Sequence, residues 1–490
     1  MLLNIKRVFA ALLMVPVLVS CATYNKSMDG YYANLRDHNY SKAMHSLEHS
    51  KLMQKNRNAL LFNLEMGKLY RLQNDFVNSN MYLNRADNLM AGNRKSFTDI
   101  AMGNLLNPMH TSYRGEDFEQ FMMHYYKALN YAALVQNEDA VVEARRITVS
   151  ANAQGEKFKN KEAHYSRDAF AFNVQGMIYE MAGDMNNAFI AYRNAAEMYS
   201  GSNNEYYGVQ MPVQLRADLV RTAAMMGFAG EQDQFEKLYR VSYAEKPAVA
   251  GELILFIEEG QAPVKQEKNF ILTAGKNGIS SFYFTDANGL NSEFNFNYNS
   301  YGIAGDKLTS QRAFRIALPQ YSVQYPQRQN VDVHVNGISY TPQLGQDLNN
   351  VAVNVLKERF LLEMGNALAR QITKKLVEKG TEAVANEAAK SNDKKEDKNA
   401  DEAEKEKEKK KKEERAKHTG EMAGFLMNVI NTATEKADTR NWQSLPAYVS
   451  YVRVPLTAGE NDITVSVNGK PVTMKIMGGK GLQMRGLSVN

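Results

Sequence analysis

The spacing of apolar residues changes once along the chain, close to residue 247. Before this point, apolar residues recur every three or four positions, which is the period of helices that bury one face. After it, they alternate with polar residues in short runs, which predicts strands at 281–284, 294–298, 314–319 and 331–335. The pattern therefore predicts an α+β fold, with an all-α N-terminal half and a β-rich C-terminal half.

One segment of the helical half shows a repeat unit clearly. Its two helices are joined at Gly183 and Asp184, and Asp184 is placed to cap the second helix. The spacing of the marker residues resembles the tetratricopeptide pattern, in which small residues stand where two antiparallel helices cross and aromatic residues fill the space beside them. The markers are Phe172, Gly176 and Tyr179 in the first helix and Ala188, Tyr192 and Ala195 in the second.

Further units of the same kind extend the pattern in both directions. Gly67, Tyr70 and Ala86 mark a second unit, and two weaker units begin near residues 37 and 128. The remaining segments with helical spacing are 95–106, 213–227 and 231–243.

We therefore expect residues 21–245 to form a right-handed, tetratricopeptide-like helical solenoid with irregular members. Each helix pair in such a fold buries its apolar face only against its neighbours, so several pairs are needed. A generic helical bundle is the alternative. A solenoid of this kind usually presents a concave surface to a peptide or a protein. The many tyrosines and methionines either line that surface or fill the helix interfaces.

The C-terminal half is expected to be a β-rich domain built from 246–347 and 438–490. An apolar run at 251–260 predicts a buried strand, and 261–265 are expected to break it. Two Asn-Gly pairs, at 336–337 and 468–469, are strong signals for tight hairpins. Near the end of the chain, we expect strands at 447–456, 462–467 and 471–476.

A helical-hairpin insertion, 348–437, separates the two groups of strands. Residues 348–389 are expected to form one helix and 420–437 a returning helix. The connecting linker, 391–417, consists almost wholly of charged residues of both signs and cannot bury enough apolar surface to order itself. We interpret it as a solvated spacer, with an electrostatic contact to a partner or an envelope polymer as the alternative.

The first residues of the chain resemble a bacterial lipoprotein signal peptide. Lys6 and Arg7 precede an apolar run, 8–19, that is too short to span a bilayer. The run ends in Leu-Val-Ser before Cys21, which resembles a lipobox. We therefore expect 1–20 to be removed and Cys21 to be lipidated, with an ordinary signal peptide as the alternative. Cys21 is the sole cysteine of the chain, and lipidation accounts for it.

Composition limits the remaining choices. The residue after Cys21 is Ala22 rather than aspartate, which by analogy with enterobacterial sorting favours the outer membrane, with the body facing the periplasm. The chain contains 23% charged and 44% hydrophobic residues, as a globular protein does, and its net charge of +5 is small. Export argues against a nucleic-acid partner. After lipidation no thiol is left for disulfides or for a cysteine nucleophile.

Three segments resemble an uncharacterised family of Gram-negative outer-membrane lipoproteins. They are 251–265, 367–370 and 437–447. The resemblance implies an N-terminal lipobox, tetratricopeptide-like repeats and a C-terminal β-rich domain, but no activity. The residues that carry it are Gly251, Gly260, Pro263, Arg370, Asp438, Arg440, Trp442 and Pro446.

The sequence predicts no catalytic site, metal site or cofactor. It lacks a phosphate-binding loop, a dinucleotide fingerprint and a His-Glu-x-x-His motif. His45 and His49 share a helix face, with His38 nearby, but we interpret them as exposed polar residues without a third ligand. Glu258 and Glu259 are adjacent on a strand, so they point to opposite faces and cannot form an acid/base pair.

Two hypotheses about function follow. The first is a lipid-anchored periplasmic scaffold, not an enzyme, that binds an envelope protein during cell-envelope assembly or regulation. The second is a peptidoglycan- or polysaccharide-binding protein, or a hydrolase, that acts through the C-terminal domain. Trp442, the sole tryptophan, is expected to anchor a core or a domain interface rather than a ligand. Asp438 and Arg440 are expected to pair beside it.

Overall fold

The protein is described by a computed structural model. It covers residues 24–93, 108–157, 165–200, 203–244, 249–274, 281–285, 291–296, 313–393, 436–479 and 481–489. The predicted signal peptide, Cys21, the expected helix at 95–106, nearly all of the charged linker and most of the returning helix lie outside the described residues. Within them, the search for a helix with the length and apolarity to cross a membrane finds none.

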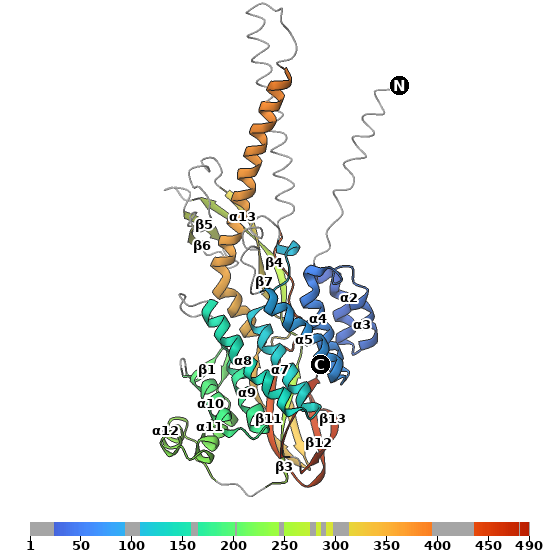
Figure 1. Cartoon of the computed structure of the whole chain (residues 1–490), viewed down its shortest axis with the longest axis vertical. Helices are drawn as coiled ribbons and strands as arrows, with labels where there is room; N and C mark the ends of the chain where they lie inside the picture. The colour runs from blue at the N-terminus through green and yellow to red at the C-terminus, as the bar shows by residue number, and fades with distance from the viewer. Residues whose placement is uncertain are drawn as a thin grey trace, which may run out of the picture.

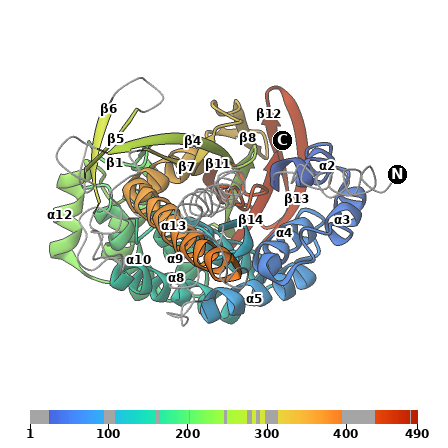
Figure 2. The same ribbon diagram turned by 90° about the horizontal axis from the view of Figure 1, so that it is seen from above.

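Antiparallel helix pairs build the N-terminal half, and each pair packs on the next. The second helices of the pairs lie on the outer side of an arc that runs from α2 and α3 to α12 (Figure 2). Small elements join the pairs: the short helices η2 (Asn56–Asn58) and η3 (Pro108–His110) and the strands β1 (Glu205–Tyr206) and β2 (Val209–Gln210). The pairs are α2 (Tyr24–Arg36) with α3 (Tyr40–Glu48), α4 (Ala59–Leu72) with α5 (Phe76–Asn93), α7 (Asp117–Ala133) with α8 (Asn137–Lys157), α9 (Ala169–Met181) with α10 (Met185–Glu197), and α11 (Val213–Met225) with α12 (Ala229–Tyr239).

Close helix crossings account for the small residues of the repeat pattern. A Cβ atom added to Gly176 on α9 would lie 2.5 Å from the ring of Tyr192 on α10. A Cβ atom added to Gly67 on α4 would lie 2.6 Å from Leu83 on α5. Tyr70 is half-buried and its ring centroid lies 5.4 Å from that of Tyr82. The other markers are buried within the stack, namely Ala86, Phe172, Tyr179, Ala188 and Ala195.

We expect Gly176→Ala to lower the free energy of unfolding by about 1–3 kcal/mol, because the added methyl group overpacks the α9–α10 crossing. Gly155 on α8 is a matched control, since nothing lies within 4 Å of its added Cβ atom. Gly155→Ala should stabilise the protein by about 0.5–1 kcal/mol through helix propensity. Urea unfolding followed by circular dichroism measures both changes, and equal effects at the two positions would contradict the packing.

The C-terminal half contains three four-stranded sheets in the described residues. The central sheet has the order β10 (Gln343–Asp347), β11 (Tyr448–Leu456), β3 (Gly251–Glu259), β14 (Gly481–Val489). The outer sheet has the order β13 (Lys470–Gly478), β12 (Gly459–Val467), β8 (Val331–Val335), β9 (Ile338–Tyr340). The distal sheet has the order β6 (Asn291–Asn295), β5 (Ser281–Thr285), β4 (Val264–Ala274), β7 (Ala313–Ser322).

Both faces of the central sheet are buried. On β3, Leu253, Leu255 and Ile257 pack against the outer sheet, whereas Ile254 and Phe256 join the core of the helix arc. A strand that is covered on both sides needs apolar residues at successive positions. This burial explains why β3 reads as a continuous apolar run, and the predicted buried strand is confirmed.

The predicted hairpin turns are present. Asn336 and Gly337 connect β8 to β9 with φ values of 48° and 84°, and Asn468 and Gly469 connect β12 to β13 with φ values of 49° and 79°. Positive φ at both central residues is the geometry of a type I′ turn, which Asn-Gly favours.

One long helix, α13 (Leu348–Asp393), extends from the body of the molecule (Figure 1). Its first turns contribute Leu348, Val351 and Val355 to the main core. Further along, Met364, Leu368 and Ile372 form a second, small core with apolar residues of β4 and β7 in the distal sheet. The 46 residues of α13 span about 69 Å at 1.5 Å per residue.

Three strands differ from the sequence-based expectation. β4 begins at Val264, inside the segment 261–265 that was expected to break the preceding strand for longer. β10 and β14 were not predicted. β14 pairs in parallel with β3, and its sequence, GLQMRGLSV, contains two glycines and no regular alternation. The domain boundaries at 245, 347 and 437 stay predictions.

Candidate functional site

The inner face of the helix arc is covered by the chain's own C-terminal half. Figure 2 shows β11 and β14 inside the arc. The ring centroids of Tyr125 and Phe256 lie 5.5 Å apart, and those of Tyr126 and Trp442 lie 5.8 Å apart. The expectation that this concave surface receives a partner is therefore wrong, because aromatic side chains from the two halves of the chain already fill it.

Every first helix of a pair takes part in this contact. Asn25 on α2 donates a hydrogen bond to the Lys265 carbonyl at 2.7 Å, and Asn173 on α9 donates to the Tyr451 hydroxyl at 3.0 Å. The other first helices, α4, α7 and α11, contribute charged or aromatic groups that are described below. The helical and β-rich halves therefore share one interior.

A buried ionic network joins α4 to β3. The Lys68 Nζ atom lies 2.5 Å from Glu258 Oε2 and 2.8 Å from the Tyr126 hydroxyl, and Ser488 on β14 donates to the same carboxylate. The guanidinium of Arg71 lies 4.0 Å from Glu258 Oε1. Burial alone would raise the pKa of Glu258, but Lys68 and Arg71 lower it more, to about 2. Glu258 is thus an ionised structural group.

A second network joins α9 and α11 to β11. Arg453 lies 2.7 Å from Glu180 and 3.1 Å from Asp218, and it also pairs with Glu252 on β3. Arg221 on α11 lies 2.8 Å from Glu180. Burial would raise the pKa of Glu180, but the two guanidinium groups hold this pKa at about 2. The network fixes the lower part of the arc to the central sheet.

The segment that precedes β11 is held in the inner face as well. Arg440 is fully buried and forms a bidentate pair with Asp438 at 2.7 and 2.9 Å, as the sequence predicts. It also donates to Asn58 Oδ1 at 2.8 Å and to the carbonyls of Pro108 and Thr111, both at 3.1 Å. The fully buried Trp442 follows it, so this tryptophan anchors the interface between the two halves.

Two buried carboxylates without ion-pair geometry flank this segment. Glu119 on α7 accepts hydrogen bonds from the Trp442 backbone at 2.7 Å and from the Tyr113 hydroxyl. Glu65 on α4 accepts from the hydroxyls of Tyr31 and Tyr32 at 3.0 and 2.7 Å. Burial raises the pKa of both carboxyl groups to about 7, and the charge of Glu116 adds to the effect at Glu119.

These values predict a stability maximum in mildly acidic solution. Because the pKa of Glu65 and Glu119 is raised from 4.5 to about 7, their contribution is complete below pH 4.5 and is lost as the pH rises to about 7. A tenfold change in proton affinity is worth about 1.4 kcal/mol, so each group loses on the order of 3 kcal/mol. Glu258 and Glu180, with pKa values of about 2, act oppositely and stabilise the protein above pH 4.5.

Urea unfolding at a series of pH values measures this dependence, and Glu119→Gln is the control. The glutamine side chain keeps the shape of the neutral carboxyl group, so it should remove part of the decline between pH 4.5 and pH 7. An unchanged slope in Glu119→Gln would contradict the assignment of the decline to this carboxylate.

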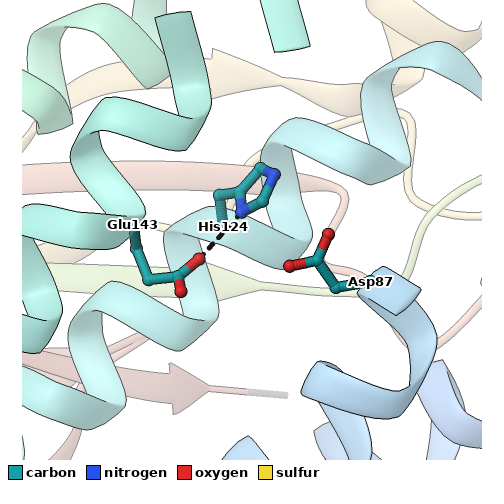
Figure 3. Close-up of side chains that lie close together, drawn as sticks. All are labelled: Asp87, His124 and Glu143. Carbon is teal, nitrogen blue, oxygen red and sulfur yellow. Dashed lines mark hydrogen bonds and ion pairs between the residues drawn. The ribbon is translucent and has the colours of Figure 1, made fainter. Parts of the chain in front are cut away.

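A separate polar cluster lies between α5, α7 and α8. Asp87, His124 and Glu143 are buried, and their ligand atoms all lie within 4.8 Å of one another (Figure 3). His124 Nδ1 lies 2.9 Å from Glu143 Oε2. Asp87 comes from α5, His124 from α7 and Glu143 from α8, so the cluster ties two neighbouring helix pairs together.

The cluster does not fit a metal ion. The Lys127 Nζ atom lies 2.9 Å from Asp87 Oδ2 and 2.9 Å from Glu143 Oε1, which is where a cation shared by the two carboxylates would sit. Arg146 supplies a second positive charge to Asp87. Burial would raise the pKa of Asp87 and Glu143, yet Lys127 contributes to lowering both. We conclude that this is an ionic clamp between helices.

Two cavities border α8, the second helix of the third pair. One, of about 280 Å³, is lined by polar residues of α5 and α8 and reaches Asp87 and Glu143 of the clamp. The other, of about 450 Å³, is lined by residues of α8 together with Met181 and Ala182 at the end of α9. Val142 lines both cavities and is 43% exposed.

The remaining residues singled out in the sequence serve the fold. Gly251 begins β3, and Gly260 adopts a φ of 65° in the turn that follows, where an added Cβ atom would lie 2.8 Å from Tyr325. Pro263 accepts a hydrogen bond from Asn441 through its carbonyl. Arg370 is buried on α13, and Pro446 precedes β11.

The pairs considered for chemistry are also resolved by position. His45 and His49 are exposed and stack with ring centroids 4.0 Å apart. Glu258 faces the helices, whereas Glu259 faces away and hydrogen-bonds to Ser450 at 3.1 Å and to the Gln329 backbone at 2.8 Å. The expectation that these two carboxylates point to opposite faces is confirmed.

The comparisons with known proteins add little to this description. No protein-family model matches the chain, and no curated protein matches it. Among solved structures, the chain is similar to one titled "Crystal structure of MamA protein", with a TM-score of 0.26 and 13% identity, over 45% of this chain and 96% of that one. A TM-score of this size carries no argument about fold or function. The helix pairs are therefore argued from their own packing.

Proposed function

We propose that this chain is a lipid-anchored scaffold of the bacterial cell envelope that binds a protein partner and is not an enzyme. The observation that carries the proposal is the filled inner face. The helix arc is built like a repeat protein, but it spends its concave surface on its own β-rich half. A partner must then use the outer side, where two cavities border α8.

The buried titratable groups support a role without catalysis. Glu258, Glu180 and Asp87 each lie in an ion pair with a lysine or an arginine that holds two parts of the fold together. Their pKa values are lowered, so none of them is poised to exchange a proton near neutral pH.

The location in the envelope is supported by the sequence alone. The lipobox-like segment ends in Cys21, which has no other thiol to pair with. The resemblance to envelope lipoproteins with tetratricopeptide-like repeats implies the outer membrane, with the body in the periplasm. The glycan-binding or hydrolase alternative loses its leading acid/base pair, because Glu258 and Glu259 face opposite sides of β3.

Crosslinking capture from intact cells tests the proposal. We expect Val142→Arg to abolish capture of the envelope protein that the native chain retains, because the arginine would block both cavities beside α8. Val472→Arg on β13 is a matched control, since Val472 is 41% exposed and Val142 is 43% exposed. Cys21→Ala should release the protein from the membrane fraction. Equal capture by Val142→Arg and Val472→Arg would contradict the proposed binding surface.

A further inference from the structure

The chain between the proposed lipid and the folded body is very short. α2 begins at Tyr24, whose side chain is fully buried and whose hydroxyl lies 2.8 Å from that of Tyr32. Three residues separate Cys21 from Tyr24, and they span at most about 11 Å. A lipid on Cys21 therefore keeps the start of α2 next to the bilayer surface. This step rests on the proposed function.

The distal sheet and α13 prevent the bilayer from lying across that end of the molecule. The start of α2 is level with Arg359 on α13, because Asn25 binds the Lys265 carbonyl, Lys265 pairs with Glu116, and Glu116 pairs with Arg359. Beyond Arg359, α13 continues for about 50 Å. It does so on the side of the body where α2 begins (Figure 1). The bilayer must then run beside α13, along the flank formed by α2 and α3.

This flank carries an excess of basic side chains. We call the exposed charged surface of residues 24–56 the α2–α3 flank. Its acidic side chains are Asp29, Asp37 and Glu48, and three exposed histidines lie among them at 38, 45 and 49. Its basic side chains are Lys26, Arg36, Lys42, Lys51 and Lys55. Clusters of lysine and arginine next to a membrane attract anionic headgroups, and the attraction falls within a Debye length.

We infer that the α2–α3 flank is a membrane-contacting surface that binds anionic lipid headgroups. In this orientation, α13 runs alongside the bilayer instead of pointing away from it, and α12 lies at the opposite end of the arc from the flank (Figure 2). The short chain supplies proximity, and the basic residues select the flank that faces the lipid. The exposed histidines, for which no metal partner is needed, belong to the same surface.

A fluorescence-quenching experiment tests this orientation. The lipidated full-length protein is reconstituted into vesicles of phosphatidylcholine and phosphatidylglycerol that carry a quencher on the headgroup. Because Cys21 is the sole cysteine and its thiol is consumed by the lipid, an introduced cysteine is the one free thiol. A fluorophore is attached to Ser27→Cys on the flank or to Gln234→Cys on α12, both exposed positions.

Quenching at Ser27→Cys should be severalfold stronger than at Gln234→Cys. The triple change Lys42→Glu, Lys51→Glu, Lys55→Glu should bring the Ser27→Cys signal down towards the Gln234→Cys signal, with the circular dichroism spectrum unchanged. Equal or stronger quenching at Gln234→Cys, in protein that floats with the vesicles, would overturn the orientation but leave the anchor standing. Protein that carries no lipid and fails to float would overturn both the anchor and the orientation.

Discussion

Glu258→Ala should lower the free energy of unfolding by about 3–5 kcal/mol, which is the usual cost of removing one partner of a buried ion pair. The substitution leaves the Lys68 ammonium inside the protein, where the side chain is 4% exposed and the carboxylate that neutralised it is gone. Burial already lowers the pKa of Lys68, and Glu258 is the largest opposing influence. Urea unfolding followed by circular dichroism measures the loss.

Two further variants make this result specific. The double variant Lys68→Met, Glu258→Leu removes both charges and should be more stable than Glu258→Ala, because no unpaired ammonium remains. The pair Lys475–Glu460 is a matched surface control, with side chains 65% and 54% exposed. Lys475→Ala should change stability by less than about 1 kcal/mol. A Glu258→Ala effect no larger than that of Lys475→Ala would contradict the buried network.

Arg440→Met should cost a similar amount, about 3–5 kcal/mol, and for a related reason. Methionine can fill the space of the side-chain stem, but it cannot donate hydrogen bonds to Asp438, to Asn58 or to the carbonyls of Pro108 and Thr111. Buried acceptors that lose their partners bear a desolvation penalty of about 1–3 kcal/mol each.

Arg85→Met serves as the control for this substitution, since Arg85 is exposed on α5. It should change stability by less than about 0.5 kcal/mol. The thermal midpoint of Arg440→Met should fall by several degrees, while that of Arg85→Met stays near the native value. Similar midpoints for the two variants would show that Arg440 does not hold the segment in place.

The elements that follow local rules could be predicted from the sequence. The α9–α10 pair was recognisable because Gly176 and Tyr192 meet at a crossing that tolerates no Cβ atom. The hairpins at Asn336 and Asn468 were recognisable because Asn-Gly favours positive φ at both positions. Strand β14 was not, because its pairing with β3 joins segments more than 200 residues apart and its own sequence does not alternate.

The filled inner face could not be predicted either, because its contacts depend on tertiary structure. Lys68 and Glu258 are 190 residues apart, and a lysine in a helix normally indicates a solvated face. One local signal was available. Glu65 and Lys68 alternate with Leu64 and Leu69 on α4, so charged residues occur on a helix with no fully polar face. Such a helix needs polar partners in the interior, and the β-rich half supplies them.

The ionic clamp was missed for the same reason. Asp87, His124 and Glu143 come from three different helices, so their spacing in the sequence carries no metal-binding or catalytic motif. The histidines that did stand out, His45 and His49, share an exposed face as a result of simple i, i+4 geometry.

The central claim is that the helix arc and the β-rich half form one unit whose interface includes the inner face of the arc. Trp442 is the sole tryptophan and is fully buried in that interface, so its fluorescence reports on the contact directly. The most direct test is urea unfolding followed in the same samples by Trp442 emission and by far-ultraviolet circular dichroism of the helices. The account predicts a single transition with the same midpoint for both signals. A red shift of Trp442 emission at lower urea concentration, while the helical signal keeps its folded value, would contradict it.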